Sequence, residues 1–193
     1  MTSRSGPLPG SVPRAGSPVV PAVFLVGFMG SGKTAVGLEL SRRLGWRFQD
    51  LDERIETRAG KPIAEIFRDS GEAGFRELER SELEHLVSEL SSIPTVAALG
   101  GGAFAQAHNI ALLEQSGGST IFLEAPLEEM WQRCQSEAKA RPLARSQNQF
   151  RQLYEARLSF YMRAGLRIPT AGKAAPEVAA EIALRLGLGE VAK

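Results

Sequence analysis

The chain has 193 residues, of which 43% are hydrophobic and 23% charged, and its 23 basic and 22 acidic residues leave a formal net charge of +1. This composition is typical of one globular domain with a substantial core, and its balanced charge argues against a nucleic-acid or membrane-surface partner. No apolar stretch approaches the roughly 20 residues of a membrane span. The single cysteine, Cys134, cannot form an internal disulfide, so we expect a reducing compartment.

Residues 1–21 differ in composition from the rest of the chain. They hold five prolines, three glycines and four serines, and no acidic residue. Such a segment buries too little apolar surface to fold, and it lacks the continuous apolar region of a secretory signal. A transit peptide shares the bias toward Ser and Arg but is usually longer. We expect a disordered tail over 1–21 and a folded domain over 22–193.

From Ala22 onward, short apolar runs alternate with helical patterns, which predicts a parallel sheet covered on both faces. The predicted strands are Val23–Val26, Trp46–Gln49, Thr95–Leu99, Thr120–Leu123 and Leu166–Ile168. The predicted helices are Lys33–Leu44, Asp52–Ala59, Ile63–Asp69, Gly71–Leu90, Ala107–Gln115, Pro126–Cys134, Asn148–Ala164 and Pro176–Leu186. Residues 135–149 show little apolar periodicity between two of these helices, which favours a mobile lid.

The segment Gly27–Thr34 reads Gly-Phe-Met-Gly-Ser-Gly-Lys-Thr and matches the phosphate-loop pattern G-x-x-x-x-G-K-[ST] at every fixed position. It lies between a predicted strand and a predicted helix, as the motif requires. Its glycines let consecutive backbone N–H groups face one anion, and the helix N-terminus adds partial positive charge. Lys33 is expected to reach the β- and γ-phosphates of a nucleoside triphosphate, and Thr34 to bind Mg²⁺. The alternative is a glycine-rich turn that only leads into a helix. The predicted nucleotide-binding residues are Gly30, Ser31, Gly32, Lys33, Thr34 and Ala35.

Two aspartates, Asp50 and Asp52, follow the second predicted strand. Ligands of parallel α/β sheets gather at the carboxyl ends of the strands, so we expect both side chains to face the crevice of the phosphate loop. One would hold the water shell of Mg²⁺, and the other would grip or deprotonate a hydroxyl group. The alternative for Asp52 is an N-cap of the helix that begins at Glu53. The spacing alone leaves both interpretations open.

Further candidates lie beyond these aspartates. Arg76 and Glu79 are three residues apart on a predicted helix, where they form either a functional pair or a solvated surface pair. Gly100–Gly102 follow a buried strand directly, which indicates that another group approaches the backbone closely. Arg141 lies in the predicted lid and Arg157 in the next helix; taken singly, each favours a structural role.

Together and in this order, these motifs resemble those of the shikimate kinases, small phosphate-loop kinases in the nucleoside monophosphate kinase superfamily. The resemblance spans about Ala22 to Leu186. Outside the phosphate loop it rests on Asp50-Leu51-Asp52 with Ile55-Glu56, on Phe75-Arg76, on Gly100–Gly102 and on Arg141-Pro142-Leu143. It implies a three-layer α/β phosphate-loop NTPase fold, with a five-stranded parallel sheet, helices on both faces and a mobile lid over about 135–149.

The resemblance also implies an activity: transfer of the γ-phosphoryl group of ATP to the 3-hydroxyl of shikimate, on the route to chorismate. It implies Mg²⁺ as cofactor, shikimate and ATP as small-molecule substrates, and a cytoplasmic monomer. The residues that it assigns are Asp52, Arg76, Gly101 and Arg157 for shikimate, Lys33, Asp52 and Arg141 for catalysis, Arg141 and Lys173 for the nucleotide, and Thr34 for the metal.

One departure from the family pattern and two alternative functions stay open. The segment Ile168–Lys173 lacks the Asp-Thr that is typical of the family, which bears on the adenine contacts expected of Lys173. The alternative functions are a related small-molecule kinase, such as a gluconate kinase, and a ligand-binding relative without catalysis. The Asp-x-Asp element with Arg76 and Arg157 argues against the first, and the presence of every key position argues against the second.

Overall fold

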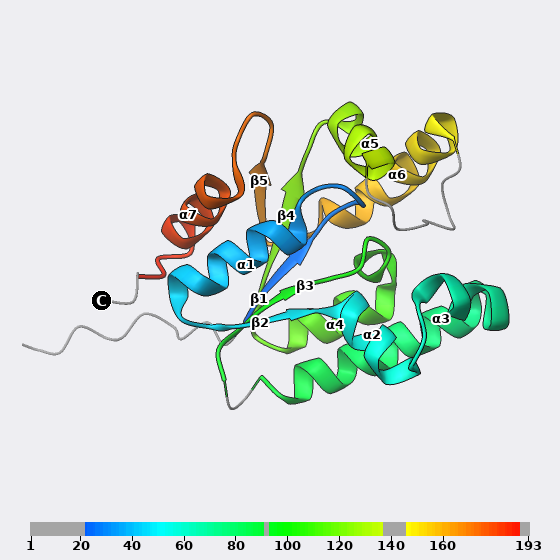
Figure 1. Ribbon diagram of the computed structural model, residues 1–193. Coiled ribbons are helices and arrows are strands. Elements are labelled where there is room, and N and C mark those ends of the chain that lie inside the picture. The colour runs from blue at the N-terminus through cyan, green and yellow to red at the C-terminus, as the bar shows by residue number, and fades with distance from the viewer. Residues whose placement is uncertain (1–21, 91–92, 137–145, 190–193) are drawn as a thin grey trace, which may run out of the picture.

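The computed structural model describes residues 22–90, 93–136 and 146–189 (Figure 1). Within these residues, five parallel strands form one sheet in the order β2-β3-β1-β4-β5. The strands are β1 (Ala22–Val26), β2 (Arg47–Asp50), β3 (Thr95–Ala98), β4 (Ser119–Glu124) and β5 (Leu166–Pro169). The predicted five-stranded parallel sheet is therefore confirmed, and no strand boundary differs from the prediction by more than one residue.

The helices are α1 (Lys33–Leu44), α2 (Leu51–Ala59), α3 (Ile63–Ser88), α4 (Ala107–Gln115), α5 (Leu127–Ser136), α6 (Gln147–Tyr161) and α7 (Ala175–Arg185), with a short 3-10 helix, η1 (Ala103–Ala105), that the pattern does not predict. Both ends of the predicted lid are helical, since α5 includes 135–136 and α6 begins at Gln147. The remainder of the lid, 137–145 with Arg141, lies outside the described residues, and so does the predicted tail over 1–21. No helix in the described part of the chain is both long and apolar enough to cross a membrane.

Burial of β1 on both faces organises the three layers. Successive side chains of a strand point to opposite faces. Phe24 and Val26 therefore pack into one core with residues of α2, α3, α4 and α6, whereas Val23 and Leu25 pack into a second core with α1 and α7. Figure 1 shows α1 and α7 together on one side of the sheet and α3 and α4 on the other. Because all strands are parallel, their carboxyl ends meet at one edge, and the loop after central β1 opens there.

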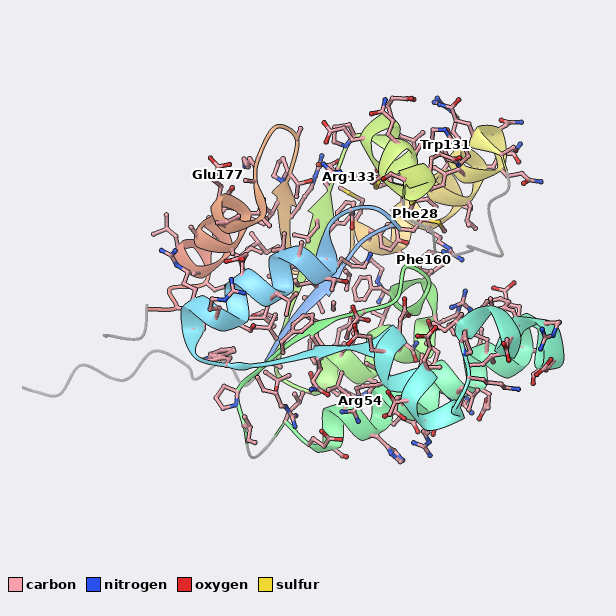
Figure 2. All side chains as sticks on the ribbon, in the orientation of Figure 1. Phe28, Arg54, Trp131, Arg133, Phe160 and Glu177 are labelled. Carbon is pink, nitrogen blue, oxygen red and sulfur yellow. The ribbon has the colours of Figure 1, made fainter. Side chains whose placement is uncertain are left out.

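A charge network ties α2 to α3 and to the end of β2. The Arg54 guanidinium donates to Glu82 Oε1 from Nε at 3.1 Å and from Nη2 at 2.8 Å, and also to Glu89 Oε1 at 2.8 Å. It donates further to Gln49 Oε1 at 2.7 Å. Arg58 donates to the second oxygen of the buried Glu82 at 3.0 Å. This network fixes the position of α2, labelled at Arg54 in Figure 2, relative to α3.

The predicted division between a helix over Ile63–Asp69 and one over Gly71–Leu90 is present as a break inside α3. Gly71 has φ 67° and ψ −173°, whereas α3 is helical on both sides of it. A side chain disfavours that backbone conformation strongly, so glycine is the residue suited to this position. The long second part of α3 carries the Arg76–Glu79 pair.

The break predicts the effect of Gly71→Ala. An alanine at this backbone conformation should cost about 1–3 kcal/mol. For a chain of this size we expect the melting temperature to fall by roughly 2–4 °C per kcal/mol, as measured by calorimetry. The control is Gly165→Ala, where φ is not positive and the added Cβ would lie 3.7 Å from its nearest neighbour. An equal effect at both positions would contradict the role of Gly71 as a required break.

Candidate active site

A cleft of about 1140 Å³ lies at the carboxyl edge of the sheet. Its walls come from the phosphate loop, the first turns of α1 and α2, the middle of α3, Gly100–Gly102, α5, α6 and the segment that joins β5 to α7. Every described candidate from the sequence lines this one cleft: Gly30, Ser31, Gly32, Lys33, Thr34, Ala35, Asp52, Arg76, Gly101, Arg157 and Lys173. Arg141 lies outside the described residues, so the structure does not place it.

The lysine of the phosphate loop, Lys33, is hydrogen-bonded to backbone carbonyls of the same loop. Lys33 Nζ donates to the carbonyl of Gly27 at 2.9 Å and to that of Phe28 at 2.8 Å, which places the ammonium over the loop. Arg133 of α5, labelled in Figure 2, donates to the carbonyl of Gly30 at 3.2 Å and pairs with Glu129 at 2.8 Å. Two cations thus contact the loop at different carbonyl groups, and an anion bound there would meet both positive charge and backbone N–H groups.

Asp50 connects the phosphate loop to α2. Its Oδ2 accepts a hydrogen bond from Thr34 Oγ1 at 2.8 Å, and its Oδ1 accepts one from the Asp52 backbone N–H at 3.0 Å. Asp50 is therefore the N-cap of α2, and the alternative that Asp52 caps this helix is wrong. The helix begins at Leu51, one residue earlier than predicted, because the short side chain of Asp50 can already satisfy a free N–H there.

The oxygen atoms of Thr34 and Asp50 are candidate ligands for a divalent cation. A hydroxyl and a carboxylate, side by side at the mouth of a phosphate loop, are the hard oxygen donors that Mg²⁺ prefers. Mg²⁺ commonly takes one or two such protein ligands and completes its shell with phosphate oxygens and water. The donor set present therefore fits the ion.

Close approach explains the three consecutive glycines. A Cβ at Gly100 would lie 2.4 Å from Asp52 Oδ1, and one at Gly102 would lie 2.5 Å from Arg76 Nη2. At Gly101 it would lie 3.2 Å from the backbone nitrogen of Met29, in the phosphate loop. Each glycine thus makes room for a different part of the site: a side chain at Gly100 or Gly102 would displace the charged group beside it, and one at Gly101 would fit only tightly against the phosphate loop.

Arg76 belongs to a buried ion pair and not to a solvated surface pair. Its Nη1 lies 2.7 Å from Glu79 Oε2, and Glu79 is only 1% exposed. Its Nη2 also lies 3.1 Å from Glu72 Oε1. Burial raises the pKa of Glu79 to about 7, although the Arg76 guanidinium acts in the opposite direction. The other carboxylate oxygen, Oε1, has no hydrogen-bond partner among the described residues, which is consistent with a strongly desolvated carboxyl group.

Arg157 has a different environment. It is 8% exposed, its Nη1 donates to the carbonyl of Gly101 at 3.2 Å, and its Cζ lies 5.9 Å from the ring centre of Phe28, which Figure 2 labels. In the described part of the chain, no carboxylate oxygen lies within 4.0 Å of the Arg157 guanidinium nitrogens, the distance limit of an ion pair. A buried guanidinium without a carboxylate retains strong affinity for an anionic ligand.

Some residues at the site are not among the sequence candidates, and one candidate has an unexpected partner. Arg133 has no local signal beyond its place in the helix before the predicted lid. Tyr161 donates to the carbonyl of Gly101, and its one signal is its position four residues after Arg157 on a predicted helix. Lys173 lines the cleft as expected, but its Nζ lies 2.6 Å from Glu181 Oε2.

The strand order, the phosphate loop after β1 and the charged groups facing it define a nucleotide-binding kinase of the phosphate-loop class. The family model described as shikimate kinase matches residues 29–186, and the chain belongs to that family.

Relatives and a solved structure agree with this assignment. The chain is 44% identical to a shikimate kinase from Geobacter sulfurreducens over 176 residues, which cover 90% of this chain and 92% of that protein. It is 38% identical to one from Persephonella marina over 164 residues, covering 85% and 98%. The solved shikimate kinase from Acinetobacter baumannii in complex with shikimate is 38% identical, with a TM-score of 0.81 over 88% of this chain and 94% of that one.

The raised pKa of Glu79 predicts how stability depends on pH. An unfolded glutamate ionises near pH 4.5, whereas the folded protein ionises Glu79 near pH 7. Between these values the folded state holds the extra proton, so the contribution of Glu79 to stability is lost as pH rises through this window, by on the order of 3 kcal/mol. Glu79→Gln cannot ionise. We expect the wild type to lose stability relative to this variant between about pH 4.5 and 7 in urea denaturation. Parallel curves would contradict the shift.

Proposed function

We propose that this protein transfers the γ-phosphoryl group of ATP to the 3-hydroxyl of shikimate, yielding ADP and shikimate 3-phosphate. Membership of the shikimate kinase family supports this reaction. The observation that carries the proposal is one cleft in which a phosphate loop faces both a carboxylate, Asp52, and a buried guanidinium without a carboxylate partner, Arg157. Such a cleft offers separate sites for a triphosphate, a hydroxyl and an anionic group.

The acceptor site suits a small hydroxylated acid. Arg157 and Arg76 would bind the carboxylate of shikimate, since each guanidinium can present two parallel donors. Asp52 would accept hydrogen bonds from ring hydroxyls, and the backbone N–H of Gly101 would donate to the ligand. Phe67 and Phe75, whose ring centres lie 4.6 Å apart, line the cleft and would contact the apolar ring face.

The two arginines would contribute unequally. Arg76 already faces two carboxylates, Glu79 and Glu72, so a ligand carboxylate has to compete for its charge. Arg157 faces a carbonyl and an aromatic ring instead. We therefore assign the larger share of carboxylate binding to Arg157.

The donor site would bind ATP through the phosphate loop. The backbone N–H groups of Gly30–Ala35 and the Lys33 ammonium would bind the phosphates, and Lys173 would lie toward the nucleotide base. Thr34 and Asp50 would hold Mg²⁺, which when bound neutralises charge on the phosphate oxygens. We assign Arg141 a similar role at the γ-phosphate.

In the transfer itself, the 3-hydroxyl oxygen of shikimate forms a bond to the γ-phosphorus, and the bond from that phosphorus to the β,γ-bridging oxygen breaks. The bridging oxygen leaves on ADP with its electron pair. Asp52 orients the hydroxyl and accepts its proton. A loose transition state needs alignment and charge neutralisation more than a strong base, so orientation is the main contribution of Asp52.

We further propose a monomer in the cytoplasm. The lone cysteine, Cys134, suits a reducing compartment.

The proposed reaction is tested by a coupled assay of ADP release with shikimate, with gluconate and without an acceptor. ADP release that depends on shikimate supports the proposal. Release that depends on gluconate would assign a different acceptor. Nucleotide binding without release in any arm would assign a binding protein without catalysis.

The carboxylate clamp predicts the effect of Arg157→Ala and Arg76→Ala. A hydrogen bond to a charged group contributes about 1.5–3 kcal/mol, so each variant should raise the KM for shikimate about tenfold or more, with a larger rise for Arg157→Ala. The KM for ATP should change much less. Steady-state kinetics with each substrate varied in turn measures both effects.

Two controls accompany this test. Arg163→Ala removes an exposed arginine that pairs with Glu114 and should leave both KM values unchanged. The methyl ester of shikimate lacks the negative charge, so it should be a poor substrate for the wild type and lose little more in either variant. Equal losses of ATP and shikimate affinity would contradict the clamp.

Lys33→Ala should lower kcat by about a hundredfold or more, because the ammonium supplies charge to the phosphates in the transition state. The melting temperature should change little, since Lys33 lies at the cleft and not in either apolar core. Lys61→Ala, which removes an exposed pair with Asp69, is the matched control. Comparable turnover in Lys33→Ala and wild type would remove the lysine from the mechanism.

A further inference from the structure

The last residue of α6, Tyr161, carries a hydroxyl into the interior behind the acceptor site. Tyr161 is fully buried, and its ring stacks on Phe122 of β4 with the ring centres 5.4 Å apart. A buried hydroxyl without a partner would cost about 1–3 kcal/mol. The hydroxyl of Tyr161 donates to the carbonyl of Gly101, the central glycine of the three that follow β3.

The same carbonyl accepts a second hydrogen bond, from Arg157 Nη1 at 3.2 Å. Arg157 and Tyr161 are four residues apart on α6 and therefore neighbours on one face of this helix. A carbonyl oxygen has two lone pairs, and both are used here. Two donors from α6 thus fix the orientation of the Gly101 carbonyl.

This carbonyl lies where three parts of the site meet. A Cβ on Gly101 would lie 3.2 Å from the Met29 nitrogen, so the glycine is held between the phosphate loop and α6. The Arg157 guanidinium contacts both the Gly101 carbonyl and the ring of Phe28, which also belongs to the phosphate loop. A shift of the carbonyl would therefore move the guanidinium as well.

We propose that Tyr161 is a positioning residue: its hydroxyl fixes the Gly101 carbonyl and, through it, orients Arg157 to receive the carboxylate of the acceptor. This inference rests on the proposed function, because it assumes that Arg157 binds that carboxylate. Burial raises the pKa of Tyr161, with Arg157 opposing the effect, so the hydroxyl stays protonated and remains a donor at neutral pH.

A purely structural role for Tyr161 makes a different prediction. The ring fills core volume against Phe122, and Tyr161→Phe keeps that ring while it removes the hydroxyl. If Tyr161 acts only by packing, the phenylalanine variant should retain both KM values. If the hydroxyl orients Arg157, the KM for shikimate should rise about threefold to tenfold, with the KM for ATP within twofold of wild type.

The chain provides a matched control, because it has two tyrosines and both lie on α6. Tyr154 packs its ring against Phe28 with the centres 5.5 Å apart. Its hydroxyl forms no hydrogen bond with the described residues. Tyr154→Phe should therefore keep the wild-type KM for both substrates.

The decisive experiment is a double-mutant cycle of Tyr161→Phe with Arg157→Ala, measured by the KM for shikimate at a temperature well below the melting point of every variant. If Tyr161 acts through Arg157, the phenylalanine substitution should raise the KM in the wild-type background and add little in the Arg157→Ala background. With the methyl ester of shikimate, Tyr161→Phe should have little effect in either background.

Three results would overturn the inference: an unchanged KM for shikimate in Tyr161→Phe, a rise of equal size in both backgrounds, or a parallel rise in the KM for ATP. These outcomes are distinct from failure of the proposed function, which would show as a wild type without shikimate-dependent ADP release.

Discussion

The site depends on a steric constraint: the backbone after β3 lies so close to its neighbours that a Cβ at Gly100 or Gly102 would overlap a charged side chain, and one at Gly101 would be tight against the phosphate loop. Gly100 lies against the Asp52 carboxylate, Gly102 against the Arg76 guanidinium, and Gly101 against the phosphate loop. The elements involved are far apart in the chain, and the parallel sheet brings their ends to one edge. Three residues without side chains let these ends meet closely at one cleft.

Within that enclosure the charges are arranged asymmetrically. Arg76 is paired with the buried Glu79, whose pKa is raised to about 7 because burial disfavours its charged form more than the ion pair favours it. Arg157 is held by a carbonyl and by aromatic packing, and its charge acts on Glu79 only at longer range than an ion pair. The charge of Arg76 is thus shared with a carboxylate of the protein, whereas the charge of Arg157 is available to a ligand.

Local features of the sequence predicted most of the fold. Strand β1, the phosphate loop that follows it in the chain and the break at Gly71 could each be predicted from a few adjacent residues. Asp50 and Asp52 show the limit of such reasoning, because a shift of two residues in the start of α2 decides which of them caps the helix. The grouping of Arg76 with Arg157 rested on resemblance to a family. The burial of Glu79 and the partners of Arg133, Lys173 and Tyr161 depend on contacts between distant segments, which local spacing does not encode.

The network around Arg54 has a consequence for how the protein responds to ionic strength. It joins α2, which carries Asp52, to α3, which carries Arg76, through carboxylates that include the buried Glu82. Mobile ions screen exposed charges strongly but reach buried pairs much less. The contacts of the buried Glu82 between α2 and α3 are therefore less sensitive to salt than those of the more exposed Glu89.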